Sequence, residues 1–265
     1  MFIRNVTQFS IVFMSLVAIG WVFTPSGHSE IDPDTIVGMW LLDEDKGKEA
    51  KDGSGNERHG TFTGSPKWRE GKFGRSVEFS GGGDTVRIDG LGQEFPTEEV
   101  TITSWVKVEG FNNQDLFSLE PLEVGNRGRV TVHMPWDGGV HWQFGSPFTG
   151  INPVALDKGV EGKWQHWTFV HSVADNVFLV YQDGKEVQRN VNSQAFVQGA
   201  ADFHIGGRLG SSFEGFVDEF AIFEAVLSPA DINGIMENGL DARVFAVSPD
   251  SKLSTSWGRI KELRE

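Results

Sequence analysis

Short apolar runs separated by glycine, aspartate and asparagine recur along this chain, and they predict many short β-strands. The runs span residues 36–42, 76–79, 85–88, 100–108, 129–133, 140–144, 164–171, 177–181, 203–205 and 213–223. Strands at this spacing favour an antiparallel sandwich or barrel. The alternation is clearest in 100–108, where Val100, Ile102 and Val106 share one face and Thr101 and Trp105 share the other.

Local signals also predict two hairpins and one helix. The dipeptides Asp137-Gly138 and Asp183-Gly184 each stand between two apolar runs, and Asp-Gly favours the tight turns that match strand twist. A short helix is expected over 230–237, because Ser228 can cap it and Pro229 suits its first position.

The first 29 residues differ from the rest of the chain. An apolar run over 9–23 follows Arg4, and it is shorter than the roughly 20 residues that span a bilayer. This pattern predicts a secretory signal, with an uncleaved N-terminal anchor as the alternative. We therefore expect a signal or anchor over 1–29, one domain over 30–245 and an amphipathic tail over 246–265. The expected localisation is secreted, periplasmic or cell-surface.

Composition narrows the classes of function. The chain has no cysteine, which excludes disulfides, zinc–thiolate sites and a cysteine nucleophile. It carries 23 Lys and Arg against 37 Asp and Glu, a formal net charge of −14. This charge argues against nucleic-acid partners, and against membrane binding beyond an N-terminal anchor. Carboxylate oxygens do suit hard cations such as Ca²⁺.

Several sequence segments, taken in order, resemble the laminin-G-like, concanavalin A-like jelly-roll domains. They are MWLLDEDKG, DGSGNERHGTF, GKFGRSVEFSGGGDTVRI, TITSWVKV, HWTFVHSVADNVFLVYQDGKEV, FHIGGR and GFVDEFAIFEAVLSPADI. The resemblance implies an all-β fold of two packed antiparallel sheets, with one short helix toward the C-terminal side. Related domains often bind carbohydrate or protein ligands on the concave face or at the rim. The fold also hosts hydrolases and structural modules, so it does not by itself define a function.

Asp218 is the most informative single position. In 214–223 a period of two puts either Asp218 or Glu219 inward, and the family pattern favours Asp218, on one face with Phe220 and Ile222. A buried carboxylate needs either a cation or several N–H donors, and both explanations stay open. In related domains the matching Asp often helps to hold structural calcium, so the resemblance implies Ca²⁺ here. The residues expected to complete such a site are Asp43, Asp52, Asn56 and Asp84.

Aromatic residues around the hairpin at 137–138 are the candidate ligand-binding group. Trp136, Asp137, His141 and Trp142 lie close together in sequence, and an exposed Trp beside polar side chains can stack on a sugar. The alternative is that these rings fill the core, as Trp and Phe usually do in sandwiches. Trp136, beside Pro135 and the turn, is the ring most expected to be exposed.

Motifs for catalysis are missing from the sequence. Retaining glucanases of this fold resemble one another through an E-x-D-x-x-E strand, whose paired carboxylates perform the reaction, and this chain has none. We therefore expect an exported, non-catalytic recognition module that binds a glycan or a cell-surface protein, with calcium as a structural cofactor. The alternative is a glycoside hydrolase whose carboxylates lie on different strands.

Overall fold

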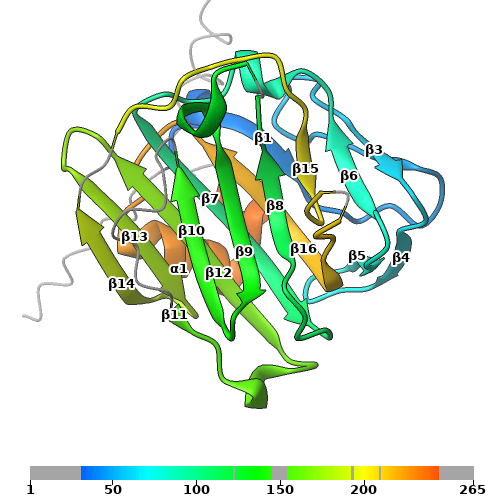
Figure 1. Ribbon diagram of the computed structural model, residues 1–265. Coiled ribbons are helices and arrows are strands. Elements are labelled where there is room, and N and C mark those ends of the chain that lie inside the picture. The colour runs from blue at the N-terminus through cyan, green and yellow to red at the C-terminus, as the bar shows by residue number, and fades with distance from the viewer. Residues whose placement is uncertain (1–30, 122, 145–153, 192–193, 209, 245–265) are drawn as a thin grey trace, which may run out of the picture.

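The computed structural model describes residues 31–121, 123–144, 154–191, 194–208 and 210–244 of the 265-residue chain. Within these residues two antiparallel sheets pack face to face (Figure 1), which confirms the predicted two-sheet jelly-roll sandwich. The segments 1–29 and 246–265, expected to be a signal or anchor and a tail, lie outside the described residues.

The longest strands of the sandwich lie in the first sheet, sheet A. In spatial order it contains β14 (Lys185–Val191), β13 (Val177–Gln182), β12 (Trp164–Ser172), β7 (Glu99–Val108), β16 (Glu214–Phe223), β5 (Arg75–Ser80) and β4 (Lys67–Glu70). Strand β1 (Ile36–Trp40) also pairs with β16. It lies along the second half of β16, on the edge where β5 pairs with the first half.

The second sheet, sheet B, carries most of the shorter strands. In spatial order it contains β11 (Val154–Ala155), β10 (Gly139–Phe144), β9 (Val130–Trp136), β8 (Asp115–Leu119), β15 (Phe203–Ile205), β6 (Thr85–Ile88), β3 (Gly60–Thr63) and β2 (Glu49–Ala50). Four short 3-10 turns lie in the connections: η1 (Pro33–Thr35), η2 (Leu91–Gln93), η3 (Gly125–Gly128) and η4 (Lys158–Val160).

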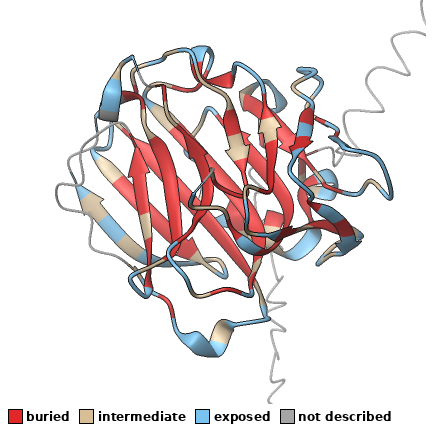
Figure 2. Cartoon of the chain, turned by 45° about the vertical axis from the view of Figure 1, so that its right-hand side comes forward, coloured by how far each residue is buried: buried red, intermediate tan, exposed pale blue. Residues whose placement is uncertain are grey.

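Aromatic rings fill the space between the two sheets. Phe117 of sheet B lies 5.8 Å from Phe169 and 5.6 Å from Phe220 of sheet A, both edge to face, between ring centroids. Figure 2 shows that the central strands of the sandwich are mostly buried, whereas exposed residues gather in the turns and on edge strands such as β14. The predicted alternation in β7 is confirmed, because Val100, Ile102 and Val106 lie in this core.

The two predicted hairpin turns are present. Asp137 and Gly138 join β9 to β10, and Asp183 and Gly184 join β13 to β14. Both residues of each turn have positive φ, which is the backbone geometry that Asp-Gly favours.

The predicted helix is also present, and it covers part of the outer face of sheet A. Helix α1 (Pro229–Asn238) begins after a capping box between Ser228 and Asp231, and α2 (Leu240–Val244) follows at once. Their buried side chains pack in one cluster with residues such as Val170 and Phe223 of the sheet. No helix in the described part of the chain is long and apolar enough to cross a membrane.

A β-bulge in β16 corrects one prediction. The register shifts between Asp218 and Ala221, where Glu219 has a φ of 54°. Phe220 and Ile222 therefore face the core between the sheets, whereas Asp218 lies opposite Trp105 on the outer face of sheet A. Asp218 is buried, as expected, but it does not share a face with Phe220 and Ile222. The extra residue in the bulge reverses the alternation.

Candidate functional site

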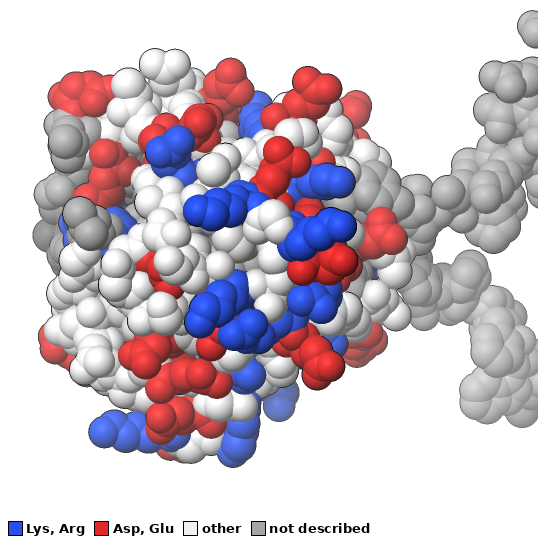
Figure 3. All heavy atoms as spheres, turned by 90° about the vertical axis from the view of Figure 1, so that its right-hand side faces the viewer, with Lys and Arg blue, Asp and Glu red and all other residues white. Residues whose placement is uncertain are grey.

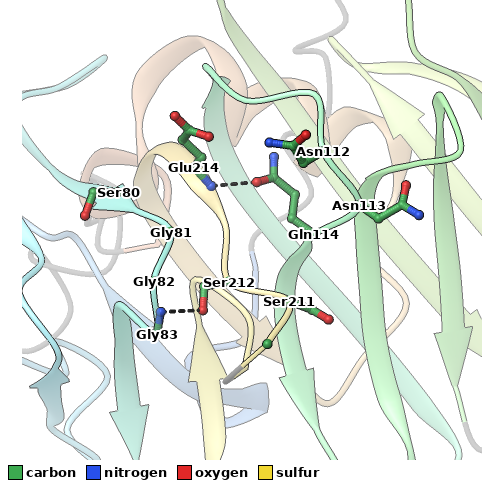
Figure 4. Close-up of a pocket in the computed structure, with 11 residues that line it drawn as sticks. Ser80, Gly81, Gly82, Gly83, Asn112, Asn113, Gln114, Ser211, Ser212 and Glu214 are labelled. Atoms are coloured by element: carbon green, nitrogen blue, oxygen red, sulfur yellow. Dashed lines mark hydrogen bonds between the residues drawn. The ribbon is translucent and has the colours of Figure 1, made fainter.

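Three loops at one end of the sandwich enclose a cleft of about 510 Å³. The β5–β6 turn contributes Ser80 and three glycines, the β7–β8 loop contributes Asn112–Gln114, and the loop before β16 contributes Gly210–Ser212, followed by Glu214. Figure 4 shows the Gly81–Gly83 turn on one side and the Asn112–Gln114 segment on the other, with Ser212 and Glu214 between them. We call this the loop-end cleft.

Two buried or half-buried side chains join the loops to one another. Gln114 is only 2 % exposed; its Nε2 donates to Gly110 O at 2.8 Å, and its Oε1 accepts from Glu214 N at 2.8 Å. The hydroxyl of Ser212 accepts from Gly83 N at 2.8 Å and donates to Arg208 O at 3.0 Å. The walls of the cleft are therefore held by hydrogen bonds between segments far apart in the sequence.

Polar groups remain available along these walls. Glu214, Asn112 and Asn113 are exposed, and Ser211 is half-buried. A side chain at Gly81, Gly82 or Gly210 would meet no atom within 4 Å, so the backbone there is open to a bound molecule. Amides, hydroxyls and one carboxylate around a shallow cleft form a donor and acceptor set that suits the hydroxyl groups of a sugar.

The β9–β10 hairpin tip adjoins the cleft through Asn113. Its side-chain oxygen accepts from Asp137 N at 2.9 Å. Trp136 is half-buried, and its carbonyl accepts a hydrogen bond from His141 Nε2 at 3.0 Å. Burial lowers the pKa of His141, which keeps its ring neutral. Trp136, Asp137 and His141 thus lie together at the hairpin tip, where Asp137 contacts the cleft residue Asn113, whereas Trp142 is 1 % exposed and packs in the core.

A buried carboxylate lies behind the hairpin tip. Asp115 is fully buried; its Oδ1 accepts from His133 Nδ1, and its Oδ2 accepts from Arg208 Nε at 2.9 Å. The His133 ring contacts the Trp136 ring, with centroids 4.7 Å apart. Arg208 also binds Glu120 at 2.8 Å. Asp115 therefore connects the loop that forms one wall of the cleft to the Trp136 ring.

Two of the predicted calcium ligands, Asp218 and Asp43, meet at the β4–β5 turn. Asp218 Oδ2 accepts from Lys72 N at 2.7 Å and Phe73 N at 2.9 Å, and Asp43 Oδ1 accepts from Arg75 N at 2.7 Å. Burial, opposed by the two N–H groups, raises the pKa of Asp218 to about 8. The backbone donors of this turn thus occupy one oxygen of each carboxylate.

Two more of the predicted calcium ligands, Asp52 and Asn56, lie in a different loop and form hydrogen bonds with nearby backbone groups. Asp52 accepts from Met39 N, Ser54 N and Arg58 N at 2.9–3.0 Å, while the Asn56 amide donates to Ile36 O at 2.7 Å.

Asp84 occupies a third place, at the far end of β5. It accepts from Ser65 N at 2.7 Å and from the Ser80 hydroxyl at 2.6 Å. Burial alone would raise the pKa of Asp84, but these hydrogen bonds lower it. The five residues therefore lie in three places. Among the described residues no three His, Cys, Asp or Glu side chains come together as a metal site.

Comparison with known proteins places this architecture in a family. The family model described as "Concanavalin A-like lectin/glucanases superfamily" matches residues 80–233, more than half of the chain. The chain belongs to the concanavalin A-like lectin/glucanases superfamily. The matched range includes every loop of the loop-end cleft and the β9–β10 hairpin. No curated protein matches the chain.

Several solved structures share the fold of this chain at low sequence identity. Domain 4 of AbnA, an extracellular arabinanase from Geobacillus stearothermophilus solved with arabinotriose, is 20 % identical with a TM-score of 0.61; the match covers 77 % of this chain and 98 % of that domain. The binding domain of Paraclostridial Mosquitocidal Protein 1 is 16 % identical with a TM-score of 0.60, over 77 % and 52 % of the two chains. Trypanosoma rangeli sialidase is 14 % identical with a TM-score of 0.58, over 77 % of this chain but only 32 % of the enzyme.

Sequence reasoning did not find the polar lining of the cleft. Asn112–Gln114 and Ser211–Glu214 lie about 100 positions apart in the sequence, and both read as ordinary polar turns. The only local signal was a concentration of Gly, Asn and Ser in three separate loops. Which of these loops meet is decided by strand pairing, which the sequence alone did not reveal.

Proposed function

We propose that this chain is a non-catalytic carbohydrate-binding module, and that the loop-end cleft together with the β9–β10 hairpin tip is its sugar site. The observation that carries the proposal is the hydrogen bond from Asp137 N to Asn113 of the polar, glycine-walled cleft, which ties the hairpin tip with the half-buried Trp136 to the edge of the cleft. The ring supplies an apolar surface for the C–H face of a sugar, and the amides and Glu214 recognise its hydroxyl groups. The superfamily and its sugar-bound neighbour support the same class of ligand.

Titration of purified protein with arabinotriose, beside a screen of neutral oligosaccharides, tests this proposal. Trp136→Ala and Glu214→Gln are each expected to weaken the Kd of the best neutral ligand at least tenfold, about 1.4 kcal/mol. Glu237→Gln on the exposed side of α1 is the matched control and should bind like wild type. Equal binding by wild type and both site variants would refute the proposed site. Release of reducing sugar would instead favour the hydrolase alternative.

Export and calcium complete the proposal. The segment 1–29 directs export, which N-terminal sequencing of the protein from outside the cytoplasm tests. We propose calcium only as an ion that stabilises the folded protein, because the five predicted ligands do not surround one point. Thermal unfolding with CaCl₂ and with EDTA tests it, and identical Tm values would remove calcium from the proposal.

A further inference from the structure

The outer face of sheet A is divided into two halves. Helices α1 and α2 cover one half, where Val170, Ala221 and Phe223 pack in a cluster with Ile232 and Leu240. The other half carries large aromatic side chains, yet no described helix packs on it. Phe73 of the β4–β5 turn lies 6.3 Å from Trp105, between ring centroids, whereas no described helix covers Trp164 and Phe216 on a face that usually carries polar side chains.

A row of side chains crosses five strands on this uncovered half. Trp164 of β12 pairs with Lys107 of β7, and Lys107 pairs with Phe216 of β16. Phe216 pairs with Glu78 of β5, and Glu78 pairs with Lys67 of β4. At the usual separation of strands this row spans roughly 19 Å, a length suited to a short stretch of polymer. We call it the outer row.

Ammonium groups lie directly over the aromatic rings of this face. Lys107 Nζ is 3.7 Å from the centroid of Phe216 and 5.5 Å from that of Trp164, and the two rings are 6.2 Å apart. Next to the outer row, Lys72 Nζ lies 4.4 Å from the centroid of Trp105. Trp105, which also contacts the rings of Phe73 and His166, is 6 % exposed, and Phe216 beneath Lys107 is 9 % exposed. Because lysine side chains are flexible, the Lys107 ammonium group can move aside and expose the rings of Phe216 and Trp164.

The charge of this region contrasts with that of the whole chain. Lys67, Arg69 and Lys72 lie on or beside β4, in a protein whose formal net charge is −14. Figure 3 shows Lys and Arg side chains gathered on the side of the molecule where Figure 1 places β4 and β5. Two of the acidic groups in this region are paired, Glu78 with Arg69 at 2.8 Å and Glu109 with Lys107 at 3.7 Å.

We propose that the outer row is a second binding surface, which takes an acidic polysaccharide whose sugars carry carboxylate or sulfate groups. The sugar rings would stack on Trp164 and Phe216, and their anionic groups would accept hydrogen bonds from Lys107 and Lys72. A neutral sugar offers the displaced ammonium groups only hydroxyl oxygens, which are weaker acceptors than carboxylate or sulfate, so the lysines select for charge. This surface is separate from the loop-end cleft, and it does not depend on the function proposed for that cleft.

Affinity electrophoresis of the purified protein in gels containing polygalacturonate tests the proposal. Fully methyl-esterified polygalacturonate is the matched ligand without charge, and dextran sulfate distinguishes sulfate from carboxylate. At least one of the two anionic polymers should retard the wild-type protein. The strength of that retardation should be at least tenfold greater than the retardation by the methyl ester. Retardation should weaken as salt rises. Lys72→Gln/Lys107→Gln and Trp164→Ala should each reduce it at least tenfold.

Controls separate this surface from the cleft and from misfolding. Lys185→Gln, an exposed lysine of β14 at the far edge of sheet A, should bind like wild type. Trp136→Ala should keep its retardation by the acidic polymer, even where it loses neutral sugars. Trp164→Phe, which keeps a ring, should restore part of the binding lost in Trp164→Ala. The proposal is overturned if wild type binds neither anionic polymer, if the lysine variant is retarded like wild type, or if single-stranded DNA is bound more tightly.

Discussion

At the scale of single residues, the described carboxylates show how a buried acid is satisfied in this fold. Asp218, Asp52 and Asp84 accept backbone N–H groups of neighbouring turns, so each holds a turn to the end of a strand. Asp115 is different, because its partners are a histidine ring and a guanidinium. Replacing this carboxylate is costly, because a buried donor that loses its acceptor gains no water in its place.

Asp115→Asn is therefore expected to destabilise the protein by about 2 kcal/mol or more. An amide offers one acceptor oxygen where His133 and Arg208 now use two, and hydrogen bonds to charged groups contribute about 1.5–3 kcal/mol each. Urea unfolding measures the change. Arg189→Gln, which breaks the exposed pair with Glu186 on β14, is the control and should leave the midpoint unchanged. A midpoint for Asp115→Asn equal to that of wild type would show that the network contributes no stability.

At the scale of elements, β16 and the β4–β5 turn depend on each other. The bulge at Asp218 and Glu219 lies where the partner of β16 changes from β5 to β1. The N–H groups of the turn bind Asp218, and Gly74 of the same turn lies against the Asp43 carboxylate. The turn therefore closes the gap between β1 and β5.

Gly74→Ala tests this dependence. Gly74 has a φ of 54°, and a methyl group there would collide with Asp43. Gly47→Ala is the matched control, because Gly47 also has a positive φ but has open space around it. Both variants should lose roughly 1–2 kcal/mol of unfolding free energy, because alanine disfavours a left-handed backbone conformation. The collision with Asp43 should cost Gly74→Ala about 1–3 kcal/mol more. Equal unfolding midpoints in urea would contradict the proposed role of the turn.

Elements coded by local signals were predicted well from the sequence, and those coded by distant pairing were not. Asp137-Gly138 and Asp183-Gly184 specify their own turns, and Ser228 with Pro229 specifies the start of α1. The bulge in β16 escaped prediction because it exists only where two other strands share one edge. Strand β8 was missed because DLFSL mixes Asp and Ser with its apolar residues. The turn beside Trp136 has a local signal, so the position of Trp136 was predicted correctly. The side to which Trp142 points depends on how distant strands pair, and it was wrongly expected on a ligand surface although it faces the core.

At the scale of the whole molecule, buried titratable groups of two kinds determine how stability varies with pH. Burial lowers the pKa of His166 to about 3 and that of His171 to about 4. Burial raises the pKa of Asp218 to about 8 and that of Glu219 to about 7. On unfolding below pH 6.5, the histidines take up protons and the two acids release them, so the two effects on stability oppose each other. Above pH 6.5 only the acids still exchange protons on unfolding.

Stability is therefore expected to fall as the pH rises from 6.5 to 8. In that window the folded state holds more protons than the unfolded state, which makes the slope of unfolding free energy against pH negative. The loss amounts to roughly 2 kcal/mol, or a fall in Tm of about 5 °C. Calorimetry from pH 6.5 to 8.5 measures it. Asp218→Asn, which keeps an acceptor oxygen but no titrating group, should flatten this slope, whereas Asp45→Asn at an exposed position should not. A wild-type Tm that stays constant over this range, or a variant at 218 that retains the full slope, would show that Asp218 is ionised in the folded protein.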